Sequence, residues 1–236
     1  MKTRGAASAP AEVALAWGRS TEVPDADGWL TPAERGVLEG LRLPKRARDW
    51  RLGRWVAKEA VRRCLGAPGL PGENVEILAA ASGRPEATIL APGPWGAITL
   101  SLSHAGGVGF AAASAAPLLL GCDVEVVEGR SDAFVDDYLT AAEATWVRRS
   151  PEGRDRRANL VWSAKESALK ALGEGLRADT RSVEVTVSEG RPGAWSSLEV
   201  CRAEGALLPG WWHAARSRVW TVVASAPVRL GPIPPD

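Results

Sequence analysis

Two periodicities alternate along the chain, one typical of helices and one typical of strands. Apolar residues recur every three to four positions at about 45–65 and 157–173, which predicts two long amphipathic helices. A helix is also expected at 131–148, and another is predicted to begin at Thr31-Pro32, because Thr is a good N-cap and Pro suits the first helical position. Shorter apolar runs bounded by Gly and Pro predict strands. These lie near 12–18, 74–80, 97–103, 108–115, 119–126, 183–188, 196–203, 211–216 and 218–225.

The chain also repeats its own pattern. Residues 55–66, WVAKEAVRRCLG, match residues 162–173, WSAKESALKALG, with Trp, Ala, Lys, Glu, Leu and Gly in register. Each copy is followed by a strand-like run that ends in Gly-Arg-Pro, and then by an apolar strand, FAAASAAP in one case and WTVVASAP in the other. Three landmarks in the same order favour duplication over two generic helices that happen to precede strands. The sequence therefore predicts an α+β fold of two similar α/β halves, with a ligand cleft between them.

The two halves meet without a low-complexity linker, which favours intimate packing. We place the N-terminal half at residues 1–118 and the C-terminal half at residues 119–228. Residues 229–236 contain three prolines and little apolar pattern, and we expect them to form a disordered tail.

Composition and charge narrow the class of protein. Of the 236 residues, 45% are hydrophobic and 24% are charged, and the net charge of +1 gives no general attraction to nucleic acid or anionic membrane. No apolar run approaches the roughly 20 residues that span a bilayer, and the N-terminus lacks the continuous apolar region of a signal peptide. The three cysteines are far apart and form neither a disulfide pattern nor a zinc motif. We therefore expect a cytoplasmic protein with no membrane or nucleic-acid partner.

The first candidate for chemistry is an Asp-x-Glu sequence at the end of an apolar run. Residues i and i+2 of a strand point to the same face, so Asp123 and Glu125 converge. Two carboxylates on one strand suit a hard cation such as Mg²⁺. Acidic residues are also common on the solvent face of a strand end, and taken alone this pattern favours that simpler interpretation.

The second candidate lies on the predicted helix at 157–173. Its polar face carries Glu166 and Lys170, which are i,i+4 neighbours, and Lys165 lies at the edge of that face. Glu166 and Lys170 could form a solvated ion pair. They could equally supply a third metal carboxylate and an ammonium group for a phosphate.

Two further groups are weaker candidates. Ser103 and His104 end an alternating strand and precede two glycines that allow backbone to approach a ligand closely. A basic stripe on the first long helix could grip phosphate, although a solvated helix face is the more common case. It comprises Arg51, Arg54, Lys58 and Arg62, with Arg48 nearby.

Taken in order, these motifs resemble the Sfp-type 4′-phosphopantetheinyl transferases. The match runs through GRP at 83–85, SLSH at 101–104, GCDVE at 121–125, WSAKESALK at 162–170 and GEGL at 173–176. The resemblance implies two halves related by pseudo-twofold symmetry, with coenzyme A bound between them. It also implies an enzyme that moves the 4′-phosphopantetheine arm of coenzyme A to a serine of an apo acyl or peptidyl carrier protein, releasing adenosine 3′,5′-bisphosphate.

The resemblance gives each motif residue a role. Asp123, Glu125 and Glu166 would hold the Mg²⁺ that binds the pyrophosphate of coenzyme A. Glu166 would also be the base, directly or through water, and Lys170 would stabilise or protonate the leaving phosphate. The other implied contacts with coenzyme A are Lys165 and His104 at its phosphates, Arg84 and Pro85 at the nucleotide end, Ser103 supporting the loop, and Arg48, Arg51 and Arg54 as candidates at the 3′-phosphate.

The chain departs from the family pattern at two positions. Ala105 stands where a second serine is frequent, and Glu174 stands where a basic residue is frequent. Glu59, the counterpart of Glu166 in the first half, has no Asp-x-Glu partner, so we expect one active centre. Resemblance to the larger, two-half members of the family implies a monomer. The alternatives are a Mg²⁺-dependent phosphohydrolase or nucleotidyl transferase, and an inactive relative that binds only coenzyme A or a carrier.

Overall fold

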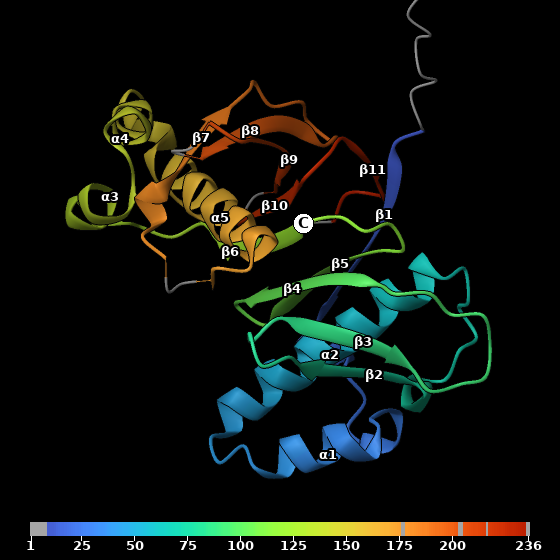
Figure 1. The fold of residues 1–236 in the computed structure, drawn as a ribbon. Coiled ribbons are helices and arrows are strands. Elements are labelled where there is room, and N and C mark those ends of the chain that lie inside the picture. The colour runs from blue at the N-terminus through green and yellow to red at the C-terminus, as the bar shows by residue number, and fades with distance from the viewer. Residues whose placement is uncertain (1–8, 176–177, 203–204, 216, 235–236) are drawn as a thin grey trace, which may run out of the picture.

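The first half of the chain forms an antiparallel sheet that one long helix covers (Figure 1). Its elements are β1 (Ala11–Arg19), α1 (Pro32–Glu39), α2 (Pro44–Cys64), β2 (Val75–Ala79), β3 (Pro85–Ile89), β4 (Thr99–Ala105) and β5 (Val108–Ser114), with the 3₁₀ helices η1 (Ser20–Glu22), η2 (Asp27–Trp29) and η3 (Gly72–Asn74). The strands pair in the order β1-β5-β4, α2 packs on β1 and β5, and a separate β2-β3 hairpin lies beside β4. The computed structural model describes residues 9–175, 178–202, 205–215 and 217–234.

The second half repeats this arrangement with one continuous sheet. Its elements are β6 (Leu120–Val126), α3 (Asp132–Tyr138), α4 (Ala141–Arg148), α5 (Arg154–Leu172), β7 (Val183–Val187), β8 (Ser196–Arg202), β9 (Leu207–Ala214) and β10 (Arg218–Ala224), with the 3₁₀ helices η4 (Pro151–Gly153) and η6 (Thr180–Ser182). The strand order is β6-β10-β9-β8-β7, and α5 packs on β6 and β10. None of the described helices is both long and apolar enough to cross a bilayer.

The two halves are related by a pseudo-twofold axis. Each contains a strand, a short helix, a long helix and four more strands, and α3 is an addition in the second half. The strand register identifies equivalent residues. Phe110 of β5 pairs with Trp17 of β1, and Trp220 of β10 pairs with Val124 of β6. Phe110 is therefore equivalent to Trp220. Phe110 and Trp220 also contact each other, with ring centroids 5.2 Å apart. Contact between equivalent positions is what a twofold relation produces, and the predicted α+β fold of two similar halves is confirmed.

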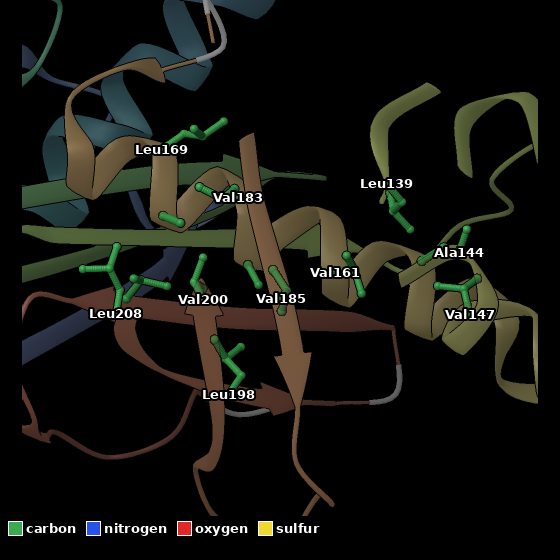
Figure 2. Close-up of a cluster of buried hydrophobic side chains, with 14 of the residues drawn as sticks. Leu139, Ala144, Val147, Val161, Leu169, Val183, Val185, Leu198, Val200 and Leu208 are labelled. Atoms are coloured by element: carbon green, nitrogen blue, oxygen red, sulfur yellow. The ribbon is translucent and has the colours of Figure 1, made fainter. Parts of the chain in front are cut away.

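The core follows from this symmetry, with one apolar cluster between the two sheets and one under each long helix. Strand β5 is buried on both faces, so Phe110 and Ala112 face the central cluster while Ala111 and Ala113 face α2. Figure 2 shows the corresponding cluster of the second half, in which Val161 and other residues of α5 pack against β7 and β8. Each sheet therefore lies between its own helix and the other sheet.

Two sequence predictions about elements are wrong, and one strand was missed. The helix expected at 131–148 is two helices, because Thr140 begins a new one by accepting the backbone N–H of Glu143 through its hydroxyl. The strand β3 was not predicted, since it lies in a half-exposed hairpin with little apolar signal. The tail is not uniformly irregular, because β11 (Val228–Leu230) pairs in parallel with β1. Predicted strand ends at 203 and 216, motif residue Leu176 and the final two residues lie outside the described residues.

Candidate active site

The candidate carboxylates project from β6 and from the helix that packs on it. Asp123 and Glu125 lie two positions apart on β6, and Glu166 and Lys170 lie one turn apart on α5. Helix α5 can approach β6 closely because Gly121 has no side chain: a Cβ there would collide with the backbone of α5. This close packing brings two distant segments of the chain to one site.

A pocket of about 310 Å³ collects these residues. It is lined by Leu102, Ser103, His104, Asp123, Glu125, Trp162, Glu166 and Lys170. The first three belong to β4 of the first half, and the others belong to β6 and α5 of the second half. The pocket therefore lies between the halves, and the structure brings together six residues that the sequence singled out.

The two oxygens of Asp123 have different environments. Oδ1 accepts a hydrogen bond from the Ser103 hydroxyl at 2.6 Å and pairs with Lys170 Nζ at 2.7 Å. Oδ2 is buried and has no hydrogen-bond partner. Burial acts to lower the pKa of Lys170, but the Asp123 carboxylate outweighs it and the pKa is raised. The ammonium group is therefore firmly charged beside an incompletely satisfied carboxylate.

The other two carboxyl groups are held less favourably in their charged form. Glu125 accepts a hydrogen bond from Trp162 Nε1 at 3.0 Å and lies 3.5 Å from a nitrogen of Arg130. Burial, reinforced by the charge of Asp123, raises the pKa of Glu125 to about 7. Burial also raises the pKa of Glu166, whose Oε1 is buried without a partner. A cation in the pocket would relieve both effects.

The donor set fits a hard cation in part. Among the described residues, no three His, Cys, Asp or Glu side chains stand close enough together to hold a metal ion as they are. Asp123 Oδ2 and Glu166 Oε1 nevertheless are buried carboxylate oxygens without a hydrogen-bond donor, and oxygen donors of this type suit Mg²⁺. Glu125 lines the same pocket as a third carboxylate. The magnesium site therefore stays a prediction, with two oxygens available to it.

Two adjoining pockets extend the site into a longer cleft. One, of about 440 Å³, shares Leu102 and His104 with the first pocket. The other, of about 250 Å³, shares Leu102 and Lys170 and is lined by Arg84 and Pro85. Arg54 lines both of the added pockets. The added pockets thus bring three further residues expected to contact coenzyme A, Arg54, Arg84 and Pro85, into one cleft with Ser103 and His104.

Lys165 is not in this cleft, which corrects the expectation that it contacts a phosphate. Its side chain is fully buried and pairs with Glu143 at 2.9 Å. Its ammonium group also donates to the carbonyl oxygens of Thr180 and Val183. The helix α5 is covered on several sides, so a residue at the edge of its polar face became part of the core.

Two of the three arginine candidates for the 3′-phosphate lie elsewhere. Arg51 pairs with Asp27 at 2.6 Å and donates to the carbonyl oxygens of Pro24 and Asp25, on the side of the η2 segment. Arg48 is exposed and lines none of the three cleft pockets. Neither arginine lines the cleft, and contact of either with the 3′-phosphate stays a prediction.

Sequence reasoning missed Lys45, Arg46 and Trp50, which line the 440 Å³ pocket. Together with Gly53 they recur at helical spacing on one face of α2. Gly53 marks the point where that face meets β4, since a Cβ there would lie 3.4 Å from the Leu102 side chain. A glycine between basic and aromatic residues at this spacing was the available signal.

Comparison with protein families gives one match. The family model of the 4′-phosphopantetheinyl transferase superfamily matches residues 119–221. This range contains β6 and α5, with all three candidate metal carboxylates and Lys170. A comparison with curated proteins gives no significant match.

Solved structures show partial likeness to the chain. A holo-(acyl-carrier-protein) synthase from Bacillus anthracis, in complex with CoA (3′,5′-ADP), is 21% identical over 44% of this chain and 94% of its own, with a TM-score of 0.37. The holo-[acyl-carrier-protein] synthase from Thermotoga maritima is 22% identical over 56% of this chain and 76% of its own, with a TM-score of 0.38.

Proposed function

We propose that the protein transfers the 4′-phosphopantetheine arm of coenzyme A to a serine of an apo acyl or peptidyl carrier protein, releasing adenosine 3′,5′-bisphosphate. The observation that carries the proposal is the convergence of Asp123, Glu125, Glu166 and Lys170 in one pocket between the halves. The family match over residues 119–221 supports the same reaction class. A charged pocket of this kind suits a reaction in which phosphate charge must be stabilised.

The cleft offers separate regions for the nucleotide end of coenzyme A and for its phosphate groups. Arg84 and Pro85 line the region next to Lys170 and would receive the nucleotide end. The neighbouring region contains His104 and Arg54 beside two further basic residues of α2, and suits phosphate groups. His104 is exposed at this region, and its imidazole can donate a hydrogen bond to a phosphate oxygen.

The reaction requires one bond to phosphorus to form and another to break. Asp123, Glu125 and Glu166 would hold Mg²⁺, which when bound neutralises charge on the pyrophosphate. Glu166 accepts the proton of the carrier serine, directly or through water. The serine oxygen then bonds to the phosphorus of the phosphopantetheine arm. The bond to the leaving phosphate breaks, and Lys170 stabilises or protonates that phosphate.

The proposal includes an Sfp-type enzyme with a single active centre, acting as a monomer. Register places Ala16 and Gly18 of β1 where β6 has Asp123 and Glu125. The first half thus offers no second set of metal carboxylates at the equivalent position. Two halves within one chain also provide both walls of the cleft, so the site needs no residue from a second copy.

The direct test is incubation with coenzyme A, Mg²⁺ and several apo carrier domains, followed by intact mass measurement. The proposal expects one carrier to gain the mass of phosphopantetheine. Glu166→Gln should abolish this gain while the protein stays folded, and Glu59→Gln, at the equivalent position of the first half, should not. No gain on any carrier, with release of phosphopantetheine to water instead, would favour the phosphohydrolase alternative.

A further inference from the structure

Each half contains a fully buried ion pair between its short helix and its long helix. In the first half, Lys58 Nζ of α2 lies 2.5 Å from Glu34 of α1. In the second half, Lys165 Nζ of α5 lies 2.9 Å from Glu143 of α4. All four side chains are at most 1% exposed. Charges are seldom buried this completely unless the surroundings satisfy every polar atom.

The glutamate of each pair ties three elements together. Glu143 Oε2 accepts the backbone N–H of Thr140 and so closes the capping box at the start of α4. Its Oε1 accepts the backbone N–H of Val185 in β7 at 2.7 Å. The first half repeats these bonds, with Glu34 accepting from Thr31 at 2.8 Å and from Ile77 at 2.9 Å.

The lysine of each pair is equally well satisfied. Besides its glutamate, Lys165 donates to the carbonyl oxygens of Thr180 at 2.9 Å and Val183 at 2.6 Å. Lys58 donates in the same way to the carbonyl oxygens of Trp29 at 3.0 Å and Gly72 at 2.8 Å. An ammonium group has three protons to donate, and in each half all three have acceptors. Each pair therefore fixes the rotation of its long helix against the hairpin that follows.

The two long helices present different residues to the cleft. Lys165 directly precedes Glu166 and lies one turn and a half before Lys170, on another side of the same helix. The bonds of Lys165 hold the far side of α5 while the near side faces Asp123. Helix α2, held by Lys58, instead presents Arg54 to the regions suited to coenzyme A.

We propose that Glu143 and Lys165 are a positioning pair for the transfer reaction, which hold Glu166 and Lys170 in register with Asp123 by fixing the rotation of α5. This inference rests on the proposed function. The Glu34–Lys58 pair has the same burial and bonding but lies on the helix that binds substrate. The Glu34–Lys58 pair is therefore a control: its loss should destabilise the fold without moving the catalytic residues of α5.

The test compares Lys165→Met with Lys58→Met in the full chain. Each variant leaves a buried carboxylate without its ammonium partner, so both should lower the urea midpoint of unfolding by a similar amount. At a temperature where both are folded, Lys165→Met should lower kcat about 10- to 100-fold, because small misplacement of reacting groups is costly. Lys58→Met should keep kcat within about twofold and act on the KM for coenzyme A. Equal losses of kcat in both variants, or none in Lys165→Met, would overturn the proposal.

A second comparison separates loss of stability from loss of positioning, in case Lys165→Met folds poorly. In Glu143→Gln/Lys165→Met both buried charges are removed, so stability should recover relative to Lys165→Met. If the pair positions α5, kcat should stay low in this double variant. If the pair serves stability alone, kcat should return together with the urea midpoint, and the proposal would be wrong.

Hydrogen exchange keeps this test separate from the test of the transfer reaction. Amide exchange of residues 154–172 should be faster in Lys165→Met than in Lys58→Met at matched overall stability. This readout needs no transfer activity. A wild-type protein that modifies no carrier would therefore contradict the proposed function, whereas unchanged exchange in α5 would contradict the positioning pair.

Discussion

The carboxyl groups of the candidate site differ in how well their oxygens are satisfied by hydrogen-bond partners. Asp123 has one oxygen bound to Ser103 and Lys170 and one with no partner. Glu125 is held by Trp162, and burial still keeps its pKa high. A buried carboxylate with unsatisfied lone pairs is costly unless a cation or a proton completes it. The site is therefore expected to respond to both pH and divalent cations.

The metal-free protein should lose stability as pH rises toward neutrality. Folding raises the pKa of Glu125 from 4.5 to about 7, so between these values the native state binds more protons than the unfolded state. The free energy of unfolding therefore falls as pH rises through this interval. Glu166, whose pKa burial also raises, acts in the same direction.

Thermal unfolding between pH 4.5 and pH 8 in the presence of a chelator measures this effect. Glu125→Gln should flatten the profile and be more stable than the wild type at pH 8. Glu128→Gln is the matched control, because Glu128 pairs with the same Arg130 but is 60% exposed. Parallel profiles for the wild type and Glu125→Gln would contradict the assignment.

At the scale of elements, the site depends on how closely α5 lies against β6. Gly121 permits this approach, since a Cβ there would meet the backbone of Ser167 and Ala171. Backbone atoms within a helix cannot move aside as a flexible side chain can. The glycine thus sets the separation between the strand that carries Asp123 and the helix that carries Glu166.

Gly121→Ala should lower the free energy of unfolding by about 3 kcal/mol or more, because overpacking against backbone cannot relax easily. It should also reduce transfer activity in the protein that remains folded, since α5 must move away from β6. Gly36→Ala is the control, because Gly36 lies in α1 with no atom within 4 Å of the added Cβ. That change should stabilise the protein by about 0.5–1 kcal/mol. Urea unfolding of both variants measures whether the free energy of unfolding falls in Gly121→Ala and rises in Gly36→Ala.

At the scale of the whole molecule, the halves share a core. The central apolar cluster joins β1 and β5 to β6 and β10, and Phe110 packs edge-on against Trp220 across it. Strand β11 adds a second connection, since the end of the second half pairs with β1 of the first (Figure 1). Neither half keeps a complete core without the other.

The two halves should therefore unfold in one transition. Trp220→Ala should lower the free energy of unfolding by about 3–5 kcal/mol, as expected for loss of a large core side chain. It should shift the whole transition instead of splitting it. Circular dichroism and hydrogen exchange in α2 and α5 during urea unfolding provide the test. Separate midpoints for the two helices would show that the halves unfold independently.

Much of the fold was predictable because local patterns carry it. The strands that contain Asp123 and Phe110 were predicted from short apolar runs, and the helix that contains Glu166 from its period of three to four residues. The internal repeat predicted two similar halves. Strand β11 was not predictable, because three residues next to prolines become a strand only when β1 offers its edge.

The sequence by itself determined most of the elements, the duplication and four charged residues of the pocket between the halves. These are Asp123, Glu125, Glu166 and Lys170. Only the tertiary structure decided which of the neighbouring charges reach that pocket. Lys165 and Glu166 are adjacent in the chain, yet one is buried against Glu143 and the other lines the cleft. Periodicity assigns a residue to one side of its own element, but the partner on that side is set by packing between distant segments. The unpaired oxygens of Asp123 and Glu166 likewise exist only because β4, β6 and α5 enclose them.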